Sequence, residues 1–410
     1  MSDSNLLIEP LPTGWENHRF GDICGRVKDS YKPVDGGGTP YVGLEHLAQG
    51  FPAFVGRGTE SEIKSSKTAF KTGDILFGKL RPYLRKGAQA DFEGVCSTDI
   101  LAFRAKTVCE SAFLRFLVHS DQFIEHAKST TSGVQHPRTS WPSLKEFRLS
   151  APPLPEQKKI AHILSTVQRA IEAQERIIQT TTELKKALMH MLLTEGLRGE
   201  PQKQSEIGLV PESWDVVPVG DICRSIVPGR NKPKVFDGDI PWLTTPNIKD
   251  LTYINADVDG LRVSLEELKS SGGRLIPEKS VIMSCVGEFG VSAVTNIEIV
   301  INQQLHAFVC PKNLNPLFLS NQLRYRKRYM QSIAAITTIP YLNKSKCESV
   351  PIALPGREEQ DEIAEAFETL ASKRNQHIAH RQVLQDLFRT LLHELMTAKI
   401  RVHDLTLTAG

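Results

Sequence analysis

Two short stretches of the 410-residue sequence carry side chains that could bind phosphates and read base edges. Lys79–Lys86 (KLRPYLRK) holds four cations around a tyrosine, and Ser132–Arg138 (SGVQHPR) is a polar stretch with one glutamine. Lys and Arg neutralise phosphates, Arg can read guanine through two hydrogen bonds, and Gln can read adenine in the same way. The alternatives are an ordinary solvated strand end and a plain loop. The candidate contacts are Lys79, Arg81, Tyr83, Arg85, Lys86, Gln135, His136 and Arg138.

The second half of the chain places its candidates elsewhere. Where the first half has its basic cluster, Cys285–Gly290 reads CVGEFG and carries no cation. Polar and basic side chains gather instead in the ranges 230–234, 244–249 and 341–346. The candidates there are Arg230, Lys232, Lys234, Asn247, Lys249, Tyr341, Asn343 and Lys344. The basic run Arg324–Tyr329 (RYRKRY) falls in a predicted helix, so we expect it to form a solvated helix face.

The sequence lacks the usual motifs for catalysis. It has no glycine-rich phosphate loop ending in Gly-Lys-Ser/Thr and no Asn/Asp-Pro-Pro-Tyr motif of the kind that amino-methyltransferases use. Short acidic–basic pairs such as Glu278-Lys279 could be fitted to a nuclease pattern, but such pairs arise by chance in most sequences. The 12 histidines form no H-E-x-x-H set, and the seven cysteines include no C-x-x-C pair. We therefore expect no catalytic site, no metal site, no bound cofactor and no disulfide.

Charge, hydropathy and cysteine content indicate the kind of partner and the cellular compartment. The net charge is only +3, so clustered charge or a partner would have to supply much of any affinity for nucleic acid. No apolar run reaches the ~18 residues that a transmembrane helix needs, and Met1–Asn5 lacks the basic start of a secretory signal. Unpaired cysteines fit a reducing compartment. These features predict a cytoplasmic protein without membrane contact.

An internal repeat organises the chain. Trp15 and Trp214 lie 199 residues apart, and so do the two Gly-Asp-Ile-Cys runs that end at Cys24 and Cys223. The repeat extends to Glu156-Gln157 and Glu359-Gln360, which lie 203 residues apart. Each half therefore reads as one globular part followed by one helical part.

The globular parts are predicted to be mixed α/β or α+β. Short strands are expected at 73–77 and 280–283, and helices at 111–128 and 316–333. The helical parts are clearer, because no Pro or Gly interrupts 156–195 or the stretch from 357 to the last residue but one. At ~1.5 Å per residue, helices of this length are about 60 Å long.

An apolar stripe runs along both predicted long helices. Its steps alternate between four and three residues, through Ile160, Leu164 and Val167 in the first helix and Ile363, Phe367 and Leu370 in the second. Such a stripe is typical of two helices that pack side by side as a coiled coil. The alternative is a single helix packed on its own domain.

Several of these stretches resemble the specificity subunits of type I restriction–modification systems. The strongest is Pro152–Ala161 (PPLPEQKKIA) at the start of a long helix, followed by Leu76–Lys86. Leu11–Trp15 (LPTGW) and Val210–Trp214 (VPESW) look like the starts of that family's target-recognition domains. The second helix departs from the pattern, since Pro355–Gln360 (PGREEQ) replaces the usual Pro-Leu-Pro-Glu-Gln. The likeness covers essentially the whole chain.

The resemblance implies a fold: two α/β (α+β) recognition domains in tandem duplication, joined by two long antiparallel coiled-coil helices. The expected divisions are a first target-recognition domain at 1–151, a central conserved helix at 152–198, a second target-recognition domain at 199–355 and a C-terminal conserved helix at 356–410.

The resemblance also implies a function. Each domain would read one half of a bipartite site in double-stranded DNA. The helices would dock two adenine-N6 modification subunits, and restriction subunits would join that assembly. S-adenosylmethionine, Mg and ATP are expected only on those partners, because the family's specificity subunit is non-catalytic. The alternatives are a specificity subunit of a related system with fused modification and cleavage activities, a methyltransferase or nuclease with its own site, and a coiled-coil scaffold that does not bind DNA.

Overall fold

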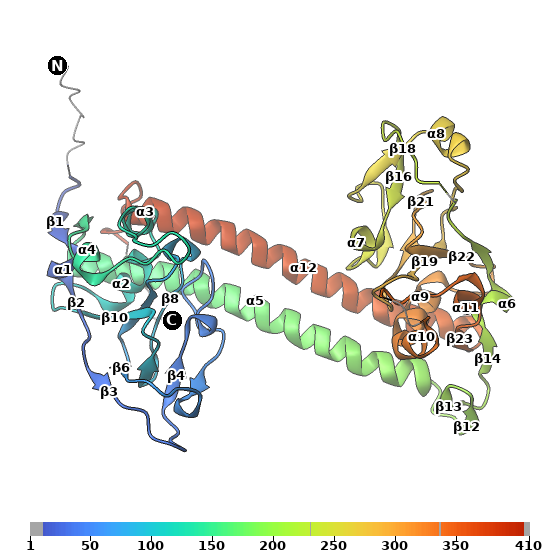
Figure 1. Ribbon diagram of the computed structural model, residues 1–410, viewed down its shortest axis with the longest axis horizontal. Coiled ribbons are helices and arrows are strands. Elements are labelled where there is room, and N and C mark those ends of the chain that lie inside the picture. The colour runs from blue at the N-terminus through green and yellow to red at the C-terminus, as the bar shows by residue number, and fades with distance from the viewer. Residues whose placement is uncertain (1–10, 230, 336–337, 406–410) are drawn as a thin grey trace. The chain divides into compact units, whose positions relative to one another are not determined.

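A computed structural model describes residues 11–229, 231–335 and 338–405. The chain divides into two compact units, and both long helices contribute to each (Figure 1). The first unit comprises residues 1–174 and 380–410, and the second comprises residues 175–379. Helix α5 spans Leu154–Thr194 and helix α12 spans Arg357–Met396. Among the described residues, no helix is long and apolar enough to cross a membrane.

The first unit contains three small sheets. A pair joins β1 to β11, a four-stranded antiparallel sheet has the order β2-β10-β7-β8, and a mixed five-stranded sheet has the order β3-β6-β9-β4-β5. The strand bounds are β1 Glu16–Arg19, β2 Cys24–Arg26, β3 Ser30–Tyr31, β4 Pro40–Val42, β5 Gly58–Thr59, β6 Lys67–Phe70, β7 Ile75–Gly78, β8 Gly87–Gln89, β9 Gly94–Cys96, β10 Ile100–Ala105 and β11 Arg148–Ala151. The helices outside α5 and α12 are α1 Phe20–Ile23, α2 Ser111–Leu117, α3 Asp121–Ser129 and α4 Trp141–Leu144, with short 3-10 turns η1 Leu44–His46, η2 Glu60–Glu62 and η3 Pro82–Leu84.

The second unit repeats this plan. The pair β14–β23 matches β1–β11, and the order β15-β22-β19-β20 matches β2-β10-β7-β8. The strands are β12 Gln202–Ser205, β13 Gly208–Pro211, β14 Asp215–Pro218, β15 Arg224–Ile226, β16 Ile240–Leu243, β17 Tyr253–Ile254, β18 Leu261–Val263, β19 Ser280–Ser284, β20 Ser292–Thr295, β21 Val300–Ile301, β22 Leu305–Val309 and β23 Pro351–Leu354. The shorter helices are α6 Val219–Ile222, α7 Thr245–Ile248, α8 Leu265–Ser270, α9 Pro316–Tyr325, α10 Lys327–Ile333 and α11 Lys344–Glu348. The structure therefore confirms the tandem duplication.

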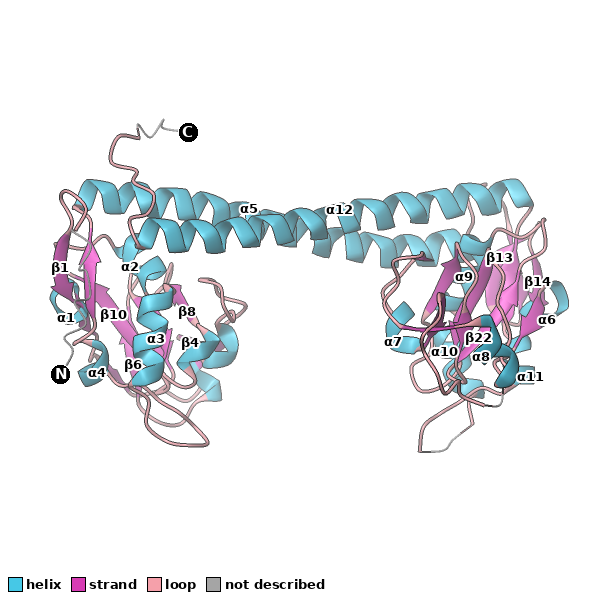
Figure 2. Ribbon diagram, turned by 90° about the horizontal axis from the view of Figure 1, so that it is seen from above, coloured by secondary structure: helices cyan, strands magenta, loops and turns pink. Residues whose placement is uncertain are grey.

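The two long helices run antiparallel and pack on each other inside both units. In the first unit, Ile160 and Leu164 from the start of α5 share a core with Leu392 and Leu395 from the end of α12. In the second unit, residues from the end of α5 share a core with Ile363 and Phe367 from the start of α12. Within each unit the sheets lie against one side of this helix pair (Figure 2). The predicted seam of the coiled coil is confirmed.

The Glu-Gln pair at the start of each long helix serves as a structural clamp. The Gln157 side chain accepts from the Glu110 backbone N–H (2.8 Å) and donates to the carbonyls of Val108 and Pro152 (3.2 and 2.9 Å). Gln360 does the same with Asn315, Asn313 and Pro355. All of these contacts satisfy loop backbone that burial would otherwise leave without partners. The second long helix therefore begins with the same contacts as the first, although Pro355–Gln360 departs from the family's usual sequence.

The glutamate of each pair binds the segment that follows the other helix. Glu156, whose side chain is 2% exposed, accepts two hydrogen bonds from the Arg401 guanidinium (2.9 and 3.0 Å). Glu359 accepts from the Leu197 N–H (2.7 Å) and from the Trp214 indole (3.2 Å). Each unit is thereby closed by a contact between the start of one long helix and the chain beyond the end of its partner.

Three expectations about helices were wrong in detail. The stretch 111–128 forms two helices, because Ser120 caps α3 through the Phe123 N–H (3.4 Å) and so ends α2. The stretch 316–333 is likewise divided into α9 and α10 at Arg326. The last long helix ends at Met396 rather than near the C-terminus, since Ala398 adopts a left-handed conformation (φ 58°).

The basic run after Leu323 is also not a simple solvated face. Arg324 is half-buried and donates to the carbonyls of Ser292 and Leu251, and Arg326 is only 7% exposed. Lys327 and Arg328 are exposed, as expected. The reason is that α9 packs on β19 and β20, so its last turn faces the sheet.

Candidate nucleic-acid interface

In the first unit, the two predicted contact stretches lie side by side. The loop after β7 and the loop 132–138 exchange backbone hydrogen bonds, from Arg81 N to Pro137 O (2.8 Å) and from Thr139 N to Lys79 O (3.0 Å). Ser132 and Arg138 also bond to each other through their backbones, which closes the second loop into a hairpin. The fold therefore brings together side chains that are more than 50 residues apart in the sequence.

The first of these loops has a strained backbone. Arg81 and Arg85, which flank η3, both adopt the left-handed conformation with φ of 51° and 49°. Non-glycine residues rarely adopt this conformation, and such strain tends to gather at functional sites. Pro82 between them is buried and fixes the turn. The strain therefore serves to present this loop at the surface in one shape.

Three of the eight predicted contacts in this unit are engaged inside the protein. Arg85 donates to the His119 carbonyl (3.1 Å) and to the Asp121 carboxylate (2.5 Å). The Lys86 ammonium donates to the Leu44 carbonyl (2.6 Å). Arg138 forms a two-pronged pair with Asp99, with N–O distances of 2.8 and 3.2 Å.

The pair of Arg138 and Asp99 sets the charge at the base of the hairpin. Hydrogen bonding to Arg138, opposed by partial burial, lowers the pKa of Asp99 below its ordinary value, and the nearby charges of Lys79 and His136 act in the same direction. Asp99 therefore stays ionised and neutralises Arg138. The two adjacent loops therefore keep a surplus of positive charge, which comes from Lys79 and Arg81.

The other five predicted contacts are available to a ligand. The side chains of Lys79, Arg81, Tyr83, Gln135 and His136 have no hydrogen bond or ion pair within the described part of the chain. All but the half-buried Lys79 are exposed, and Tyr83 is 51% exposed. We refer to these five residues with Val134, which is fully exposed at the hairpin tip, as the first loop cluster.

The second unit builds the same pair of loops from different residues. Gly287 N donates to Pro340 O (2.8 Å) and Leu342 N donates to Cys285 O (2.8 Å), and Ala335 bonds to Tyr341 across the hairpin. These contacts match those of Arg81, Thr139 and Ser132 in the first unit. Tyr341 stands where the first unit has Arg138, and Ile339 stands where it has His136. We refer to Ile339 and Tyr341, which are 59% and 42% exposed, as the second loop cluster.

The remaining candidates of the second unit are divided among several tasks. The side chain of Asn247, in the first turn of α7, accepts from the N–H of the N-cap residue Thr244 (2.8 Å), and the side chain of Asn343 caps α11 by accepting from the Lys346 N–H (2.9 Å). Lys249 is paired with Glu288 (2.8 Å) and Lys344 with Glu348 (3.5 Å).

The stretch 230–234 is a separate surface. The Lys232 ammonium lies over the rings of Phe236 and Trp242, at 5.7 and 5.4 Å. The backbone of Lys234 donates to Glu267, and its side chain is exposed. Arg230 lies outside the described residues.

Val134 and Ile339 were not among the contact residues predicted from the sequence. Both sit in the matched hairpins, near Pro137 and Pro340, which are 203 residues apart. This is the same offset that relates Glu156 to Glu359, so the repeat could have located the second hairpin. What the repeat could not show is that apolar residues stand fully or half exposed at these tips.

The two loop clusters differ in the chemistry that they offer. The first offers cations for phosphates, and Gln135 and Arg81 for adenine and guanine edges. The second offers an aromatic hydroxyl and an aliphatic side chain, which suit hydrogen bonds to base edges and contact with a thymine methyl. The same scaffold therefore presents two chemically different surfaces.

Comparison with known proteins identifies the relatives of this fold. A family model for the type I restriction modification DNA specificity domain matches residues 12–182 and again residues 211–382. The specificity subunit of the type I restriction enzyme MjaVIII from Methanocaldococcus jannaschii is 24% identical, over 96% of this chain and 95% of that protein.

Solved structures have the same fold. The S subunit of a type I restriction–modification system from M. genitalium matches with a TM-score of 0.59 and 15% identity, covering 93% of this chain and 96% of that one. A chain from a study of complex assembly and conformational transition in the type I R-M system matches with a TM-score of 0.55 and 21% identity, covering 94% and 98%.

Proposed function

The chain belongs to the type I restriction–modification DNA specificity family, and from this premise we propose that its two units each read one half of a bipartite DNA site. It is a specificity subunit with two recognition domains in tandem. In this proposal the chain positions the modification subunits relative to the DNA. The loop clusters contact the DNA, and the long helices hold the modification subunits that act on adenines.

The observation that carries this proposal is the matched pair of hairpins with unmatched side chains. The segments at Pro137–Thr139 and Pro340–Leu342 make the same backbone hydrogen bonds to the loop that follows the equivalent strand, β7 or β19. Yet one hairpin carries Gln135, His136 and Arg138, and the other carries Ile339 and Tyr341. A scaffold that is kept while its exposed tips change is what two readers of different half-sites require.

The proposal assigns the chemistry to partner subunits. We propose that the chain is non-catalytic, that modification subunits bring S-adenosylmethionine, and that restriction subunits bring Mg and ATP. The target adenine would be flipped out of the duplex into the partner's site. The absence of the amino-methyltransferase motif and of a phosphate loop from the sequence supports this division of labour.

The test of this proposal separates recognition from catalysis. The purified chain is incubated with DNA and labelled S-adenosylmethionine, with and without modification subunits of its system. We expect methyl transfer only in the presence of the modification subunits. Methylation by the chain alone would contradict the proposal, and so would sequence-specific methylation by the modification subunits without this chain.

A further inference from the structure

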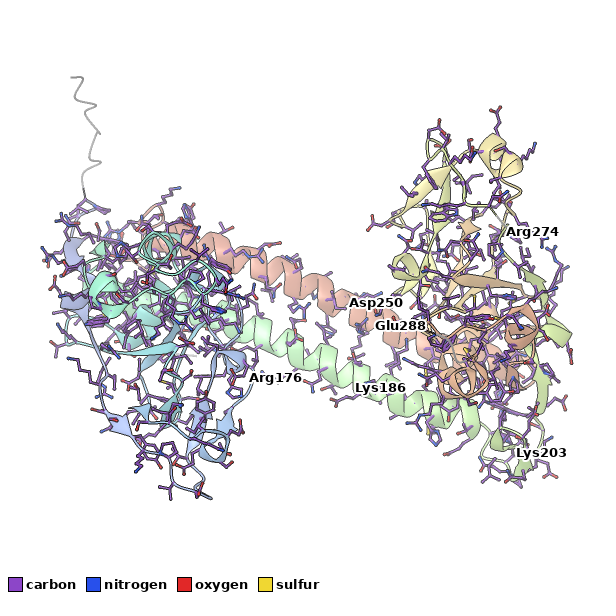
Figure 3. All side chains as sticks on the ribbon, in the orientation of Figure 1. Arg176, Lys186, Lys203, Asp250, Arg274 and Glu288 are labelled. Atoms are coloured by element: carbon purple, nitrogen blue, oxygen red, sulfur yellow. The ribbon has the colours of Figure 1, made fainter. Side chains whose placement is uncertain are left out.

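The second unit contains a cavity lined by cations that the function described above does not use. The cavity has a volume of about 250 Å³ and lies between α5, α12, the end of α9 and the segment after α7. Its charged side chains are Lys185, Lys186, Lys249, Asp250, Arg324 and Arg374. Figure 3 labels Lys186 on α5 and Asp250 on the segment after α7.

The charges around this cavity do not balance. Lys249 is neutralised by Glu288 (2.8 Å). Lys185 and Arg374 have no hydrogen bond or ion pair with any described residue. Asp250 is the one carboxylate among the lining residues, so it faces four cations besides Lys249. A cluster of like charges with so little compensation costs stability unless a ligand neutralises it.

The cations also repel one another. Burial, together with the charges of Arg324 and Arg374, lowers the pKa of Lys185 to about 8. Arg324 is held in place by the carbonyls of Ser292 and Leu251, which bind its Nε and Nη2. The guanidinium is thus fixed at the cavity wall rather than free to turn into solvent.

The first unit provides an internal comparison, because the arginines that line its equivalent cavity are paired, Arg85 with Asp121 and Arg389 with Asp386. Its cavity of about 400 Å³ is lined by Gln385, Phe388, Arg389 and Leu392 of α12. These positions are 203 residues beyond Thr182, Lys185, Lys186 and Met189, which line the cavity of the second unit. Lys185 therefore replaces a phenylalanine that is 3% exposed and packs on Phe51 and Phe116.

The other two cations of the cavity, Arg374 and Arg324, also correspond to neutral residues of the first unit. Arg374 corresponds to Ile171, which is 4% exposed in the core of the first unit. Arg324 corresponds to His119, and both side chains bond to the carbonyl of the equivalent strand, at Ser292 and Gly87. Burial lowers the pKa of His119 to about 4, so it is neutral. Three neutral residues in one unit have become three cations in the other.

A polar residue in a helix seam often serves to fix the register of a coiled coil. That explanation does not account for Lys185 and Arg374, because they are two like charges from the two helices. A register pair would place a carboxylate or an amide opposite the cation. The arrangement is instead that of an anion site, in which Arg and Lys side chains converge on one small space.

We propose that the cavity bounded by Lys185, Arg324 and Arg374 binds a phosphate group. A phosphate group carries up to about two negative charges and several acceptor oxygens. It can therefore neutralise more of the cavity's cations than the single carboxylate of Asp250 does. The volume is several times the roughly 30 Å³ that a water molecule occupies in the liquid, so a tetrahedral oxyanion fits with part of its hydration. The group comes either from free inorganic phosphate or from the backbone of DNA.

The first experiment titrates inorganic phosphate into the full-length chain at constant ionic strength, with calorimetry and thermal unfolding as readouts. The test variant is K185F/R374I, which installs the residues of the first unit. We expect the wild type to bind phosphate and to unfold at a higher temperature in its presence. The variant should lose at least about tenfold in phosphate affinity. Without phosphate it should be at least as stable as the wild type.

The matched control is K203Q/R274Q, which also removes two positive charges. Lys203 on β12 and Arg274 after α8 are exposed and lie away from the cavity (Figure 3). This control should bind phosphate like the wild type. If K185F/R374I does not fold, the single variant K185M provides the same comparison. Absence of phosphate binding by the wild type, or equal binding by a folded cavity variant, would overturn the proposal.

The second experiment identifies the source of the phosphate, using the assembly with modification subunits. If the group belongs to DNA, inorganic phosphate should compete with DNA, and K185F/R374I should weaken DNA binding evenly across sequences with a flatter salt dependence. If the group is free phosphate, the DNA affinity should not change in the variant. Either result is consistent with the site. Both are separate from the reading of half-sites, which the methylation pattern reports.

Discussion

At the scale of single residues, the first unit divides its polar surface between structure and recognition. Arg85, Lys86 and Arg138 bind Asp121, Leu44 and Asp99 inside the protein, whereas the first loop cluster keeps its side chains for a ligand. A basic residue in a suitable stretch of sequence is therefore a weak guide to DNA contact. The partner that it finds in the fold decides its availability.

This division predicts the effect of K79A/R81A on the assembled complex. Both residues lack internal partners, so DNA binding should weaken while folding is preserved. If Arg81 reads a base, discrimination should fall by about 1–3 kcal/mol at one position of one half-site. If both residues bind phosphates, affinity should fall evenly and the salt dependence should flatten. Binding is measured at several salt concentrations on matched DNA sites.

The control for that measurement is K71A/R148A. Lys71 is exposed at the other end of β7, Arg148 is exposed on β11, and neither side chain has a partner among the described residues. We expect this variant to bind DNA like the wild type. Equal losses in the two variants would show that bulk charge, rather than the first loop cluster, governs binding.

At the scale of elements, the Glu-Gln pair at the start of each long helix explains why this phrase is the most recognisable part of the sequence. The glutamine completes the backbone of a nearby loop, and the glutamate ties down the segment beyond the partner helix. The pair therefore joins three parts of a unit through two adjacent side chains. Its role is structural rather than catalytic.

The clamp predicts a pH-dependent loss of stability in E156Q. Burial alone would raise the pKa of Glu156, but the hydrogen bonds from Arg401 and Val402 outweigh it and lower the pKa. Its contribution is therefore complete above the ordinary glutamate pKa and is lost as the pH falls through the lowered folded-state value. At pH 7 we expect E156Q to lower the free energy of unfolding by about 1.5–3 kcal/mol, as for hydrogen bonds to charged groups.

Denaturant unfolding at a series of pH values measures this difference. The gap between wild type and E156Q should begin to narrow below the ordinary glutamate pKa of about 4.3, and should close only when the pH falls below the lowered folded-state pKa of Glu156. The control is E93Q, since Glu93 is exposed and has no partner among the described residues. A gap that stays constant with pH would show that the Arg401 contact is not what stabilises this corner.

Much of this element-scale organisation was predictable, and particular residues show where prediction stopped. Local patterns located β7, β19 and both long helices, because spacing and proline placement act over a few residues. The break at Ser120 and the burial of Arg324 were not predictable, since a cap and a sheet contact compete with helical periodicity. The loop clusters were found only in part, because their assembly depends on contacts between distant strands.

At the scale of the whole molecule, two units of one design differ at their tips and in their cavities. The net charge is +3 over 410 residues, and the first loop cluster contributes only two cations without a partner among the described residues, Lys79 and Arg81. Phosphate neutralisation by the chain alone is therefore small. The two units also differ at an equivalent position of the long helices, which is Phe388 in the first unit and Lys185 in the second.

This charge balance predicts that tight DNA binding depends on partners. The isolated chain should bind its site weakly and with little specificity at physiological salt, and modification subunits should strengthen specific binding greatly. Fluorescence anisotropy with labelled DNA, at fixed salt and with increasing modification subunit, measures this dependence. Nanomolar specific binding by the isolated chain would contradict the prediction.

Whether each unit reads one half-site can be determined by mapping methylated adenines genome-wide after changing the loop that carries Gln135. In the test variant, residues Val134–His136 are replaced by Thr-Thr-Ile, the sequence of the equivalent positions 337–339. Cells carrying the modification subunits and either the wild type or this variant are compared by single-molecule sequencing. We predict that one half of the methylated motif changes or loses stringency, while the other half keeps its sequence. Changes in both halves together, or an active variant with the parental motif, would contradict the account.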